Sequence, residues 1–183
     1  MIQERDAAVK EAVMRVGQQM LTAAVTAPKA HGDDHIEVFL LSGEEKDVLA
    51  KHMLDIYEET GADFFKRDAG NVKASECVVI LAAKNEAILL GDCGFCGFEN
   101  CGKMSAAGAN CAFNVTDLGI AIGSAVSVAA DNRVDSRVMF SAGKAALRMD
   151  FLDPSVRVCY GIPLSATTKS IFYDRDPGSV LVK

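Results

Sequence analysis

Apolar positions along the chain follow two spacings, one typical of helices and the other of strands. From Glu4 to Val25 they recur every three or four residues, which places them on one helix face (Val9, Val13, Val16, Met20 and Ala24). The Ala27–Pro28 step ends this helix, because the residue before a proline disfavours helical backbone angles. After a polar loop, the branched and aromatic run from Ile36 to Leu41 predicts a strand.

A second helix and a fully covered strand are expected next. Ser42-Gly43-Glu44-Glu45 has the spacing of a capping box, in which the serine and glutamate side chains bind free backbone N–H groups. The helix should run from Glu44 to Glu59, with Gly61 as its left-handed cap. Its buried face would comprise Val48, Leu49, Met53 and Ile56. The uninterrupted apolar run from Cys77 to Ala83 predicts a strand covered on both faces.

The second half of the chain predicts a long helix of small residues, from about Ser105 to Ala130. Gly119 and Gly123 lie one turn apart in it and allow another backbone to approach, so we interpret it as a central core helix with close neighbours. The remaining elements are a weaker helix at Val134–Leu147, a strand at Val156–Ile162 ending at Pro163, and an arm or edge strand at Ser165–Lys183. Because helices and strands alternate, we expect a single α+β domain over residues 1–183, with helices flanking a mixed sheet.

Composition and charge narrow the class of protein. Half of the 183 residues are hydrophobic, and the net charge is -6, which disfavours nucleic-acid binding. The charged start, Met1 to Asp6, has no apolar signal segment, so we expect a cytoplasmic protein. Asp117 divides the apolar stretch 104–130 into charge-free runs of 13 residues, each shorter than the roughly 20 that span a membrane. We therefore predict no membrane partner.

The most informative feature is a cysteine cluster. Cys93, Cys96 and Cys101 lie in one loop, each followed by a glycine, and Cys111 follows after nine residues. In a reducing compartment such a cluster favours metal or redox chemistry over disulfides. Four thiols brought together hold zinc tetrahedrally or ligate an iron–sulfur cluster, and the glycines would let the backbone fold tightly around either. The alternative is a set of unligated surface thiols.

We expect a metal centre in the region 91–111, with Cys93, Cys96, Cys101 and Cys111 as its ligands. A zinc ribbon usually brings two CxxC knuckles and only Cys93/Cys96 forms one, while the spacing does not match the bacterial ferredoxin run either. Iron–sulfur, as a 4Fe–4S cluster, is the favoured cofactor and zinc the alternative. Cys111 is the nearest remaining thiol for the fourth position. The alternatives are Asp92 and Glu99, and Cys77 or Cys159 if folding brings one of them close. Phe95 and Phe98 would shield the site from water.

Other candidate groups have simpler interpretations. Cys77 and Cys159 fall inside predicted strands, where cysteine acts as a small hydrophobe. The His31–His35 stretch, with two histidines and two aspartates, is interpreted as a solvated loop and not as a metal site. The chain has no G-x-G-x-x-G, no phosphate-binding Gly-Lys-Ser/Thr and no G-x-S-x-G motif.

Two resemblances extend these expectations. Asp92–Lys103 together with Asn110–Ile122 resembles the ferredoxin-domain-containing proteins of unknown function from bacteria and archaea, over roughly Cys77 to Pro163. The layout of the chain resembles the nitroreductase-like flavoprotein fold. The shared features are an N-terminal helix whose Ala-Pro turn leads to a strand (Ala23 to Leu41), a central helix that contains Leu118-Gly119, and a late strand that ends in Gly161-Ile162-Pro163.

The second resemblance implies an intertwined homodimer that holds FMN at the subunit interface. The arginine-rich N-terminal motif that grips the FMN phosphate in that family has no counterpart here, where Glu4-Arg5-Asp6 offers one arginine between acids. Lys169 and Arg175 remain as candidate phosphate partners. The likeness therefore supports the fold and a dimer more than it supports flavin binding.

Three functions are compatible with these patterns. The leading hypothesis is an iron–sulfur electron-transfer protein that works with a redox partner protein. The second is an FMN-dependent oxidoreductase of nitroreductase type, and the third is a structural zinc protein. The sequence identifies no catalytic residue and no substrate.

Overall fold

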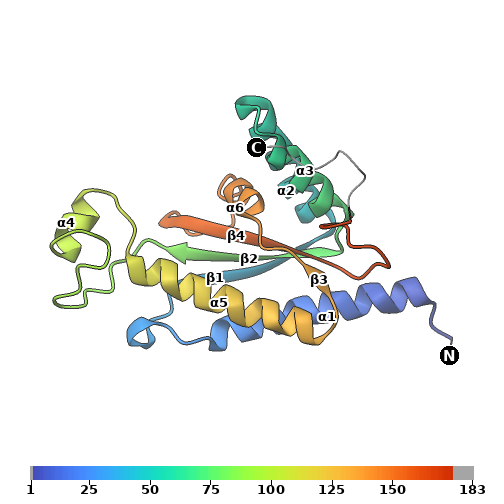
Figure 1. The fold of residues 1–183 in the computed structure, drawn as a ribbon, viewed down its shortest axis with the longest axis horizontal. Helices are drawn as coiled ribbons and strands as arrows, with labels where there is room; N and C mark the ends of the chain where they lie inside the picture. Colours follow the sequence, from blue (N-terminus) through green and yellow to red (C-terminus); the bar gives the residue numbers. More distant parts are fainter. Residues whose placement is uncertain (1, 175–183) are drawn as a thin grey trace.

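The computed structural model describes residues 2–174. It is an α+β fold in which helices cover both faces of a four-stranded sheet with the order β1-β2-β4-β3 (Figure 1). The strands are β1 (Ile36–Ser42), β2 (Cys77–Lys84), β3 (Asp135–Ser136) and β4 (Val156–Ser165). The strands expected near β1, β2 and β4 are confirmed, although β4 continues through Pro163 instead of ending there.

All strand pairings in the described part of the chain are antiparallel, which corrects the expected mixed sheet. The reason is a helix that the sequence pattern did not predict. Two helices, α2 (Gly43–Thr60) and α3 (Asp63–Ala74), connect β1 to β2. Because the pair returns the chain to the end of the sheet where β1 stopped, β2 must run in the opposite direction, whereas a single helix would have given a parallel pair.

The cap at the end of α2 is confirmed, and the capping box at its start is not. Gly61 adopts the left-handed conformation, with φ of 69°, and its N–H donates to the carbonyl of Tyr57 at 2.8 Å. Ser42 is the N-cap residue, but its side chain makes no capping hydrogen bond. Ser42 is also the last residue of β1, and its extended backbone continues the strand up to the helix.

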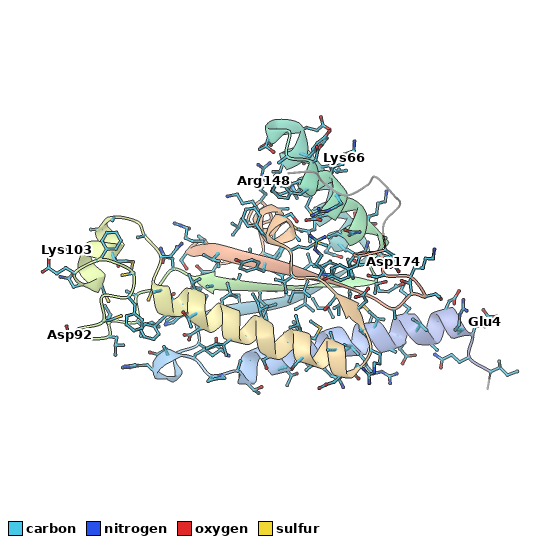
Figure 2. The ribbon with its side chains drawn as sticks, in the orientation of Figure 1. Glu4, Lys66, Asp92, Lys103, Arg148 and Asp174 are labelled. Carbon is cyan, nitrogen blue, oxygen red and sulfur yellow. The ribbon has the colours of Figure 1, made fainter. Side chains whose placement is uncertain are left out.

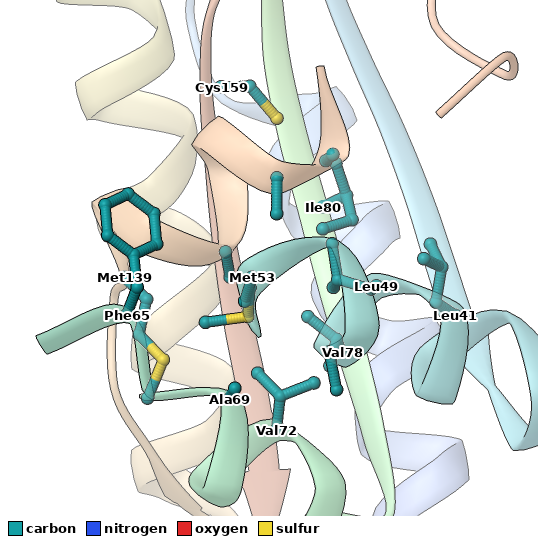
Figure 3. Packing of buried hydrophobic residues seen from close by; sticks show 14 of the residues in the cluster. Leu41, Leu49, Met53, Phe65, Ala69, Val72, Val78, Ile80, Met139 and Cys159 are labelled. Atoms are coloured by element: carbon teal, nitrogen blue, oxygen red, sulfur yellow. The ribbon is translucent and has the colours of Figure 1, made fainter. Parts of the chain in front are cut away.

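β2 contributes to two hydrophobic cores, one on each face of the sheet. Cys77, Val79, Leu81 and Ala83 pack with α1 (Arg5–Thr26) and α5 (Ala112–Asp131). The alternate residues Val78, Ile80 and Ala82 pack with α2, α3 and α6 (Phe140–Ala146), as Figure 3 shows around Leu49, Met53 and Val72. Burial on both sides explains why the apolar run in this strand is uninterrupted.

The long helix begins later than predicted. The chain first forms a short helix, α4 (Cys101–Ala106), and then turns at Gly108, whose φ of 65° interrupts the helical path before α5 starts at Ala112. In the described residues α5 is the one helix that is long and apolar enough to cross a membrane, and 33% of its most apolar window is buried. Its buried side chains, among them Leu118, Ala121 and Ala125, pack against α1 and the sheet.

The outer face of α5 does not have the close neighbours that we expected. Gly119 and Gly123 are exposed, and a Cβ added at either would meet nothing within 4 Å in the described part of the chain. The glycine pair therefore leaves an open surface on the single chain. The neighbouring Val115 and Ile120 are also exposed on this helix, at 40% and 41%.

The predicted helix at 134–147 is only partly helical. Asp135–Ser136 form β3 beside β4, and α6 occupies Phe140–Ala146. The C-terminal part continues past β4 with turns, and Phe172 is fully buried in the core beside α2 and α3. Residues 175–183, which complete the expected arm, lie outside the described residues. In those described, the segment after Ser165 adds no further strand to the sheet.

Candidate metal centre

Three parts of the chain bring the four predicted cysteines to one end of the molecule. Beyond β2 the chain forms a loop that projects from the sheet together with α4, and Asp92 and Lys103 mark this projection in Figure 2. Cys93 and Cys96 lie in the loop, Cys101 is the first residue of α4, and Cys111 is the N-cap residue of α5. All four are free thiols, and all four line a single cavity of about 280 Å³.

The loop backbone folds tightly at two of the three glycines that follow a cysteine. Gly94 and Gly97 have φ values of 61° and 81°, a region that residues with a Cβ rarely adopt, and the Gly97 N–H donates to the Gly94 carbonyl at 2.9 Å. Gly102 lies inside α4 and has no positive φ. The start of α4 is fixed by Asn100, whose side-chain oxygen accepts a hydrogen bond from the Lys103 N–H at 3.0 Å.

The inner wall of the cavity is apolar. Cys111 and Met104 are 7% and 2% exposed and form a small buried cluster with Ile88. Phe98 lines the cavity, as expected for a group that excludes water. Phe95 instead is 76% exposed and stacks on Phe113, with ring centroids 5.5 Å apart, and Phe113 is the ring that lines the cavity. Phe113 was not among the residues that the sequence pattern indicated.

The outer rim carries the two carboxylates that were considered as alternative ligands. Asp92 and Glu99 both line the cavity, and both are exposed. The Glu99 carboxylate accepts a hydrogen bond from the Lys103 ammonium group, so it already has a cationic partner. In the part of the chain that the structure describes, no three His, Cys, Asp or Glu side chains converge closely enough to hold one metal ion. In the described residues the four cysteines thus line one cavity without three of their thiols meeting at a point.

The two remaining cysteines lie apart from this site, on opposite faces of the sheet. Cys77 packs in the core beside α1 and α5, and Cys159 packs beside α2, α3 and α6. Burial raises the pKa of each thiol to about 12, because the apolar surroundings disfavour the charged thiolate. This confirms their interpretation as core residues.

The other polar candidates take structural partners. His35 Nδ1 lies 3.3 Å from a Glu86 carboxylate oxygen, and the Lys29 ammonium lies 3.6 Å from Asp34. The backbone N–H of Ala30 donates to the buried carboxylate of Asp117 at 3.0 Å, which ties the 30–32 turn to α5. Of the candidate phosphate partners, Lys169 is exposed and Arg175 lies outside the described residues.

Comparison with known sequences gives the family. The model of a family described as "Uncharacterized protein containing a ferredoxin domain" (DUF2148) matches residues 107–175, a segment that includes Cys111 and follows the loop cysteines. A protein from Archaeoglobus fulgidus is 40% identical over 166 residues, which are 86% of this chain and 89% of the relative. The chain belongs to this ferredoxin-domain family. The family resemblance of the sequence is thereby confirmed.

Solved structures similar to this member of the ferredoxin-domain family establish the nitroreductase-like fold. An oxidoreductase containing FMN aligns with a TM-score of 0.60 and 12% identity, covering 85% of this chain and 67% of its own. Nitroreductase CinD from Lactococcus lactis, solved in complex with chloramphenicol, aligns with a TM-score of 0.58 and 12% identity over 100% of this chain and 90% of its own. At this identity the likeness concerns the fold.

Proposed function

We propose that this protein is an iron–sulfur electron-transfer protein whose cluster is ligated by Cys93, Cys96, Cys101 and Cys111. The observation that carries the proposal is the single cavity lined by all four thiols, which come from a loop and the starts of two helices. Membership of a family described by its ferredoxin domain supports the same function.

The donor set and the form of the cavity favour a cluster over a single zinc ion. Thiolates suit both, but four thiolates on one zinc converge at about 2.3 Å from the ion, whereas an iron–sulfur cluster has several irons between its ligands. The four cysteines line one cavity of about 280 Å³, and this supports a cluster of several irons over a single ion. When bound, such a cluster supplies one-electron transfer. The protein supplies the ligands, while Phe98, Phe113 and Met104 keep water from the inner side.

The experiment is anaerobic reconstitution of the purified chain with iron and sulfide, followed by iron and sulfide assays and visible absorption. Each of the four single Cys→Ser variants should lose most of its iron, and Cys159→Ala, which removes a thiol from the core, should keep it. Stoichiometric zinc in a colourless wild-type protein would establish the zinc alternative instead. Full iron content in all four variants would refute the ligand assignment.

The fold favours one other candidate function, an FMN-dependent oxidoreductase in which the cluster passes electrons to a flavin. The supporting observation is the similarity to an oxidoreductase containing FMN. The missing arginine-rich segment near Arg5 and the exposed position of Lys169 give no support for a phosphate site. A flavin spectrum that remains with the protein through gel filtration would establish this function.

We propose further that the protein is a homodimer formed through the outer face of α5. Val115, Gly119, Ile120 and Gly123 are exposed there, and between Cys111 and Asp131 the helix carries a single charged residue, Asp117, which is buried. Glycines on an apolar face let a second helix approach closely, and a two-fold axis would cover both faces reciprocally. A cytoplasmic location, where thiols stay reduced, and a redox partner protein complete the proposal.

A further inference from the structure

Two asparagine side chains fasten the chain on both sides of Cys111 to the end of β2. The Asn85 side-chain amide donates a hydrogen bond to the carbonyl of Ala109 at 3.2 Å, just before Cys111. The Asn114 amide, in the first turn of α5 after Cys111, donates to the carbonyls of Lys84, at 3.0 Å, and of Glu86. These bonds link segments that are 24 to 30 residues apart in sequence.

The orientation and burial of Asn114 show how firmly this connection is built. Asn114 is 2% exposed, and both of its amide hydrogens are used by the two carbonyls. The reverse orientation would turn its oxygen toward two carbonyl oxygens, so the hydrogen bonds determine which way the amide points. Its oxygen is buried and receives no hydrogen bond in the described part of the chain, an unusual state for a buried acceptor. The side chain therefore serves the two carbonyls alone.

The three loop cysteines are held differently. The hydrogen bonds around them are local, such as Gly97 to Gly94 and Lys103 to Asn100. The end of β2, by contrast, is part of the sheet, since the Lys84 N–H donates to the His35 carbonyl and the Asn85 N–H to the Ser155 carbonyl. Hydrogen bonds thus connect the segment around Cys111 to the sheet, whereas those around Cys93, Cys96 and Cys101 stay within the projecting loop, which contacts α5 through the stack of Phe95 on Phe113.

We propose that Asn114, assisted by Asn85, is a positioning residue for the metal centre: it holds the Cys111 thiol at the cavity wall through hydrogen bonds to the end of β2. This role rests on the proposed function, because it requires Cys111 to be a ligand. Groups that orient ligands determine how tightly a metal is held, and hydrogen bonding around cluster sulfurs tunes their potential. Loss of the Asn114 amide should release the first turn of α5 and displace one ligand relative to the others.

The test uses Asn114→Leu, which removes both donors, keeps the number and branching of side-chain heavy atoms and adds no charge. In the metal-free protein, the amide of Val115, which donates to the Cys111 carbonyl at 3.3 Å, should exchange its hydrogen about tenfold faster than in wild type. After reconstitution, the variant should lose iron to a chelator about tenfold faster. The EPR spectrum of its reduced cluster should also differ from that of wild type.

Asn71→Leu is the matched control. Asn71 also donates its amide to a backbone carbonyl, that of Ile171, and its oxygen is also buried without a hydrogen bond in the described residues, but it lies in α3. This variant should lose stability and keep the iron retention and the EPR spectrum of wild type. If it loses iron as fast as Asn114→Leu, the effect is general destabilisation and the positioning role is refuted. If Asn114→Leu does not fold, Asn85→Ala decides, with a smaller change expected in the same direction.

The failure of this inference differs from the failure of the proposed function. A wild-type protein that takes up no iron and sulfide refutes the proposed function, and the positioning role with it. Wild-type uptake combined with unchanged iron retention, EPR spectrum and amide exchange in Asn114→Leu refutes the positioning role alone.

Discussion

At the scale of single residues, the six cysteines differ in what surrounds each thiol. Cys77 and Cys159 are enclosed by apolar side chains, and burial raises the pKa of each to about 12. Cys93, Cys96 and Cys101 are partly exposed beside a cavity that also carries carboxylates on its rim. A thiol reacts and binds metal as the thiolate, so the buried pair stays inert at neutral pH.

The raised pKa values predict a loss of stability at alkaline pH. An unfolded cysteine ionises near pH 8.5, so between that pH and about 12 the unfolded chain releases a proton that the folded chain keeps. The stabilisation is complete below pH 8.5 and is lost as the pH rises toward 12. For each of Cys77 and Cys159, the unfolding free energy should therefore fall by about 2 kcal/mol between pH 8 and 10.5.

Urea unfolding of wild type and Cys77→Ala at both pH values measures this effect. The variant lacks one of the two thiols whose pKa is raised, so its unfolding free energy should fall less with pH than that of wild type. Other groups that titrate in this range are common to both proteins and cancel in the comparison. Equal losses in the two proteins would show that ionisation of Cys77 does not contribute.

At the scale of elements, α6 and β4 pack very closely at two glycines, which leave no room for a Cβ atom. A Cβ added at Gly143 would lie 1.8 Å from the carbonyl oxygen of Cys159, and one added at Gly161 would lie 2.6 Å from the Cβ of Ala142. The two glycines let α6 lie directly on the strand. At this contact the Met139 N–H donates a hydrogen bond to the Gly161 carbonyl at 2.8 Å, and the Met139 carbonyl accepts one from the Gly161 N–H at 3.1 Å.

We predict that Gly143→Ala destabilises the fold by about 3 kcal/mol, because the new methyl group meets backbone atoms that have no room to move. The control is Gly70→Ala in α3, where an added Cβ meets nothing within 4 Å in the described residues. That change should stabilise the protein by about 1 kcal/mol, since alanine favours the helix. Thermal unfolding of both variants makes the comparison, and equal stability of the two would contradict it.

At the scale of the whole molecule, the candidate centre adjoins the helix that carries the exposed apolar residues Val115 and Ile120. α5 begins directly after Cys111, at the wall of the cavity, and carries its exposed apolar residues further along the helix. A dimer through this face would therefore hold two centres in a defined relation to each other. The helices α2 and α3, which lie across the sheet from α5, would stay outside such an interface (Figure 1).

We predict that Ile120→Glu converts the dimer into a folded monomer. A charge on the open face of α5 cannot be covered by a second copy without losing its hydration, and the side chain is already 41% exposed in the single chain. Leu54→Glu in α2, at a side chain that is 42% exposed, should leave the dimer intact. Light scattering coupled to gel filtration measures the mass of each variant. A wild-type monomer at high concentration, or a wild type that requires detergent, would contradict the dimer.

Local pattern was sufficient for the elements that depend on neighbouring residues. The uninterrupted apolar run at Cys77–Ala83 predicted a strand buried on both faces, and Gly61 predicted the end of α2. Both signals, a continuous apolar run and a glycine cap, lie within a few neighbouring positions. The pattern missed α3, where five of twelve residues are charged and Gly70 weakens the helical signal of the sequence. Without α3, the direction of β2 relative to β1 could not be derived.

The four candidate ligands could be chosen from spacing and composition, whereas their placement around one cavity required the tertiary structure. Nine residues separate Cys101 from Cys111, and their path through α4 and the turn at Gly108 is not evident from any periodicity. The position of Cys111 depends on hydrogen bonds from Asn85 and Asn114 across 24 to 30 residues. The spacing of the cysteines was enough to select the four candidate thiols. Only the folded chain decided that they share one cavity, because contacts between distant segments are set by packing and not by local pattern.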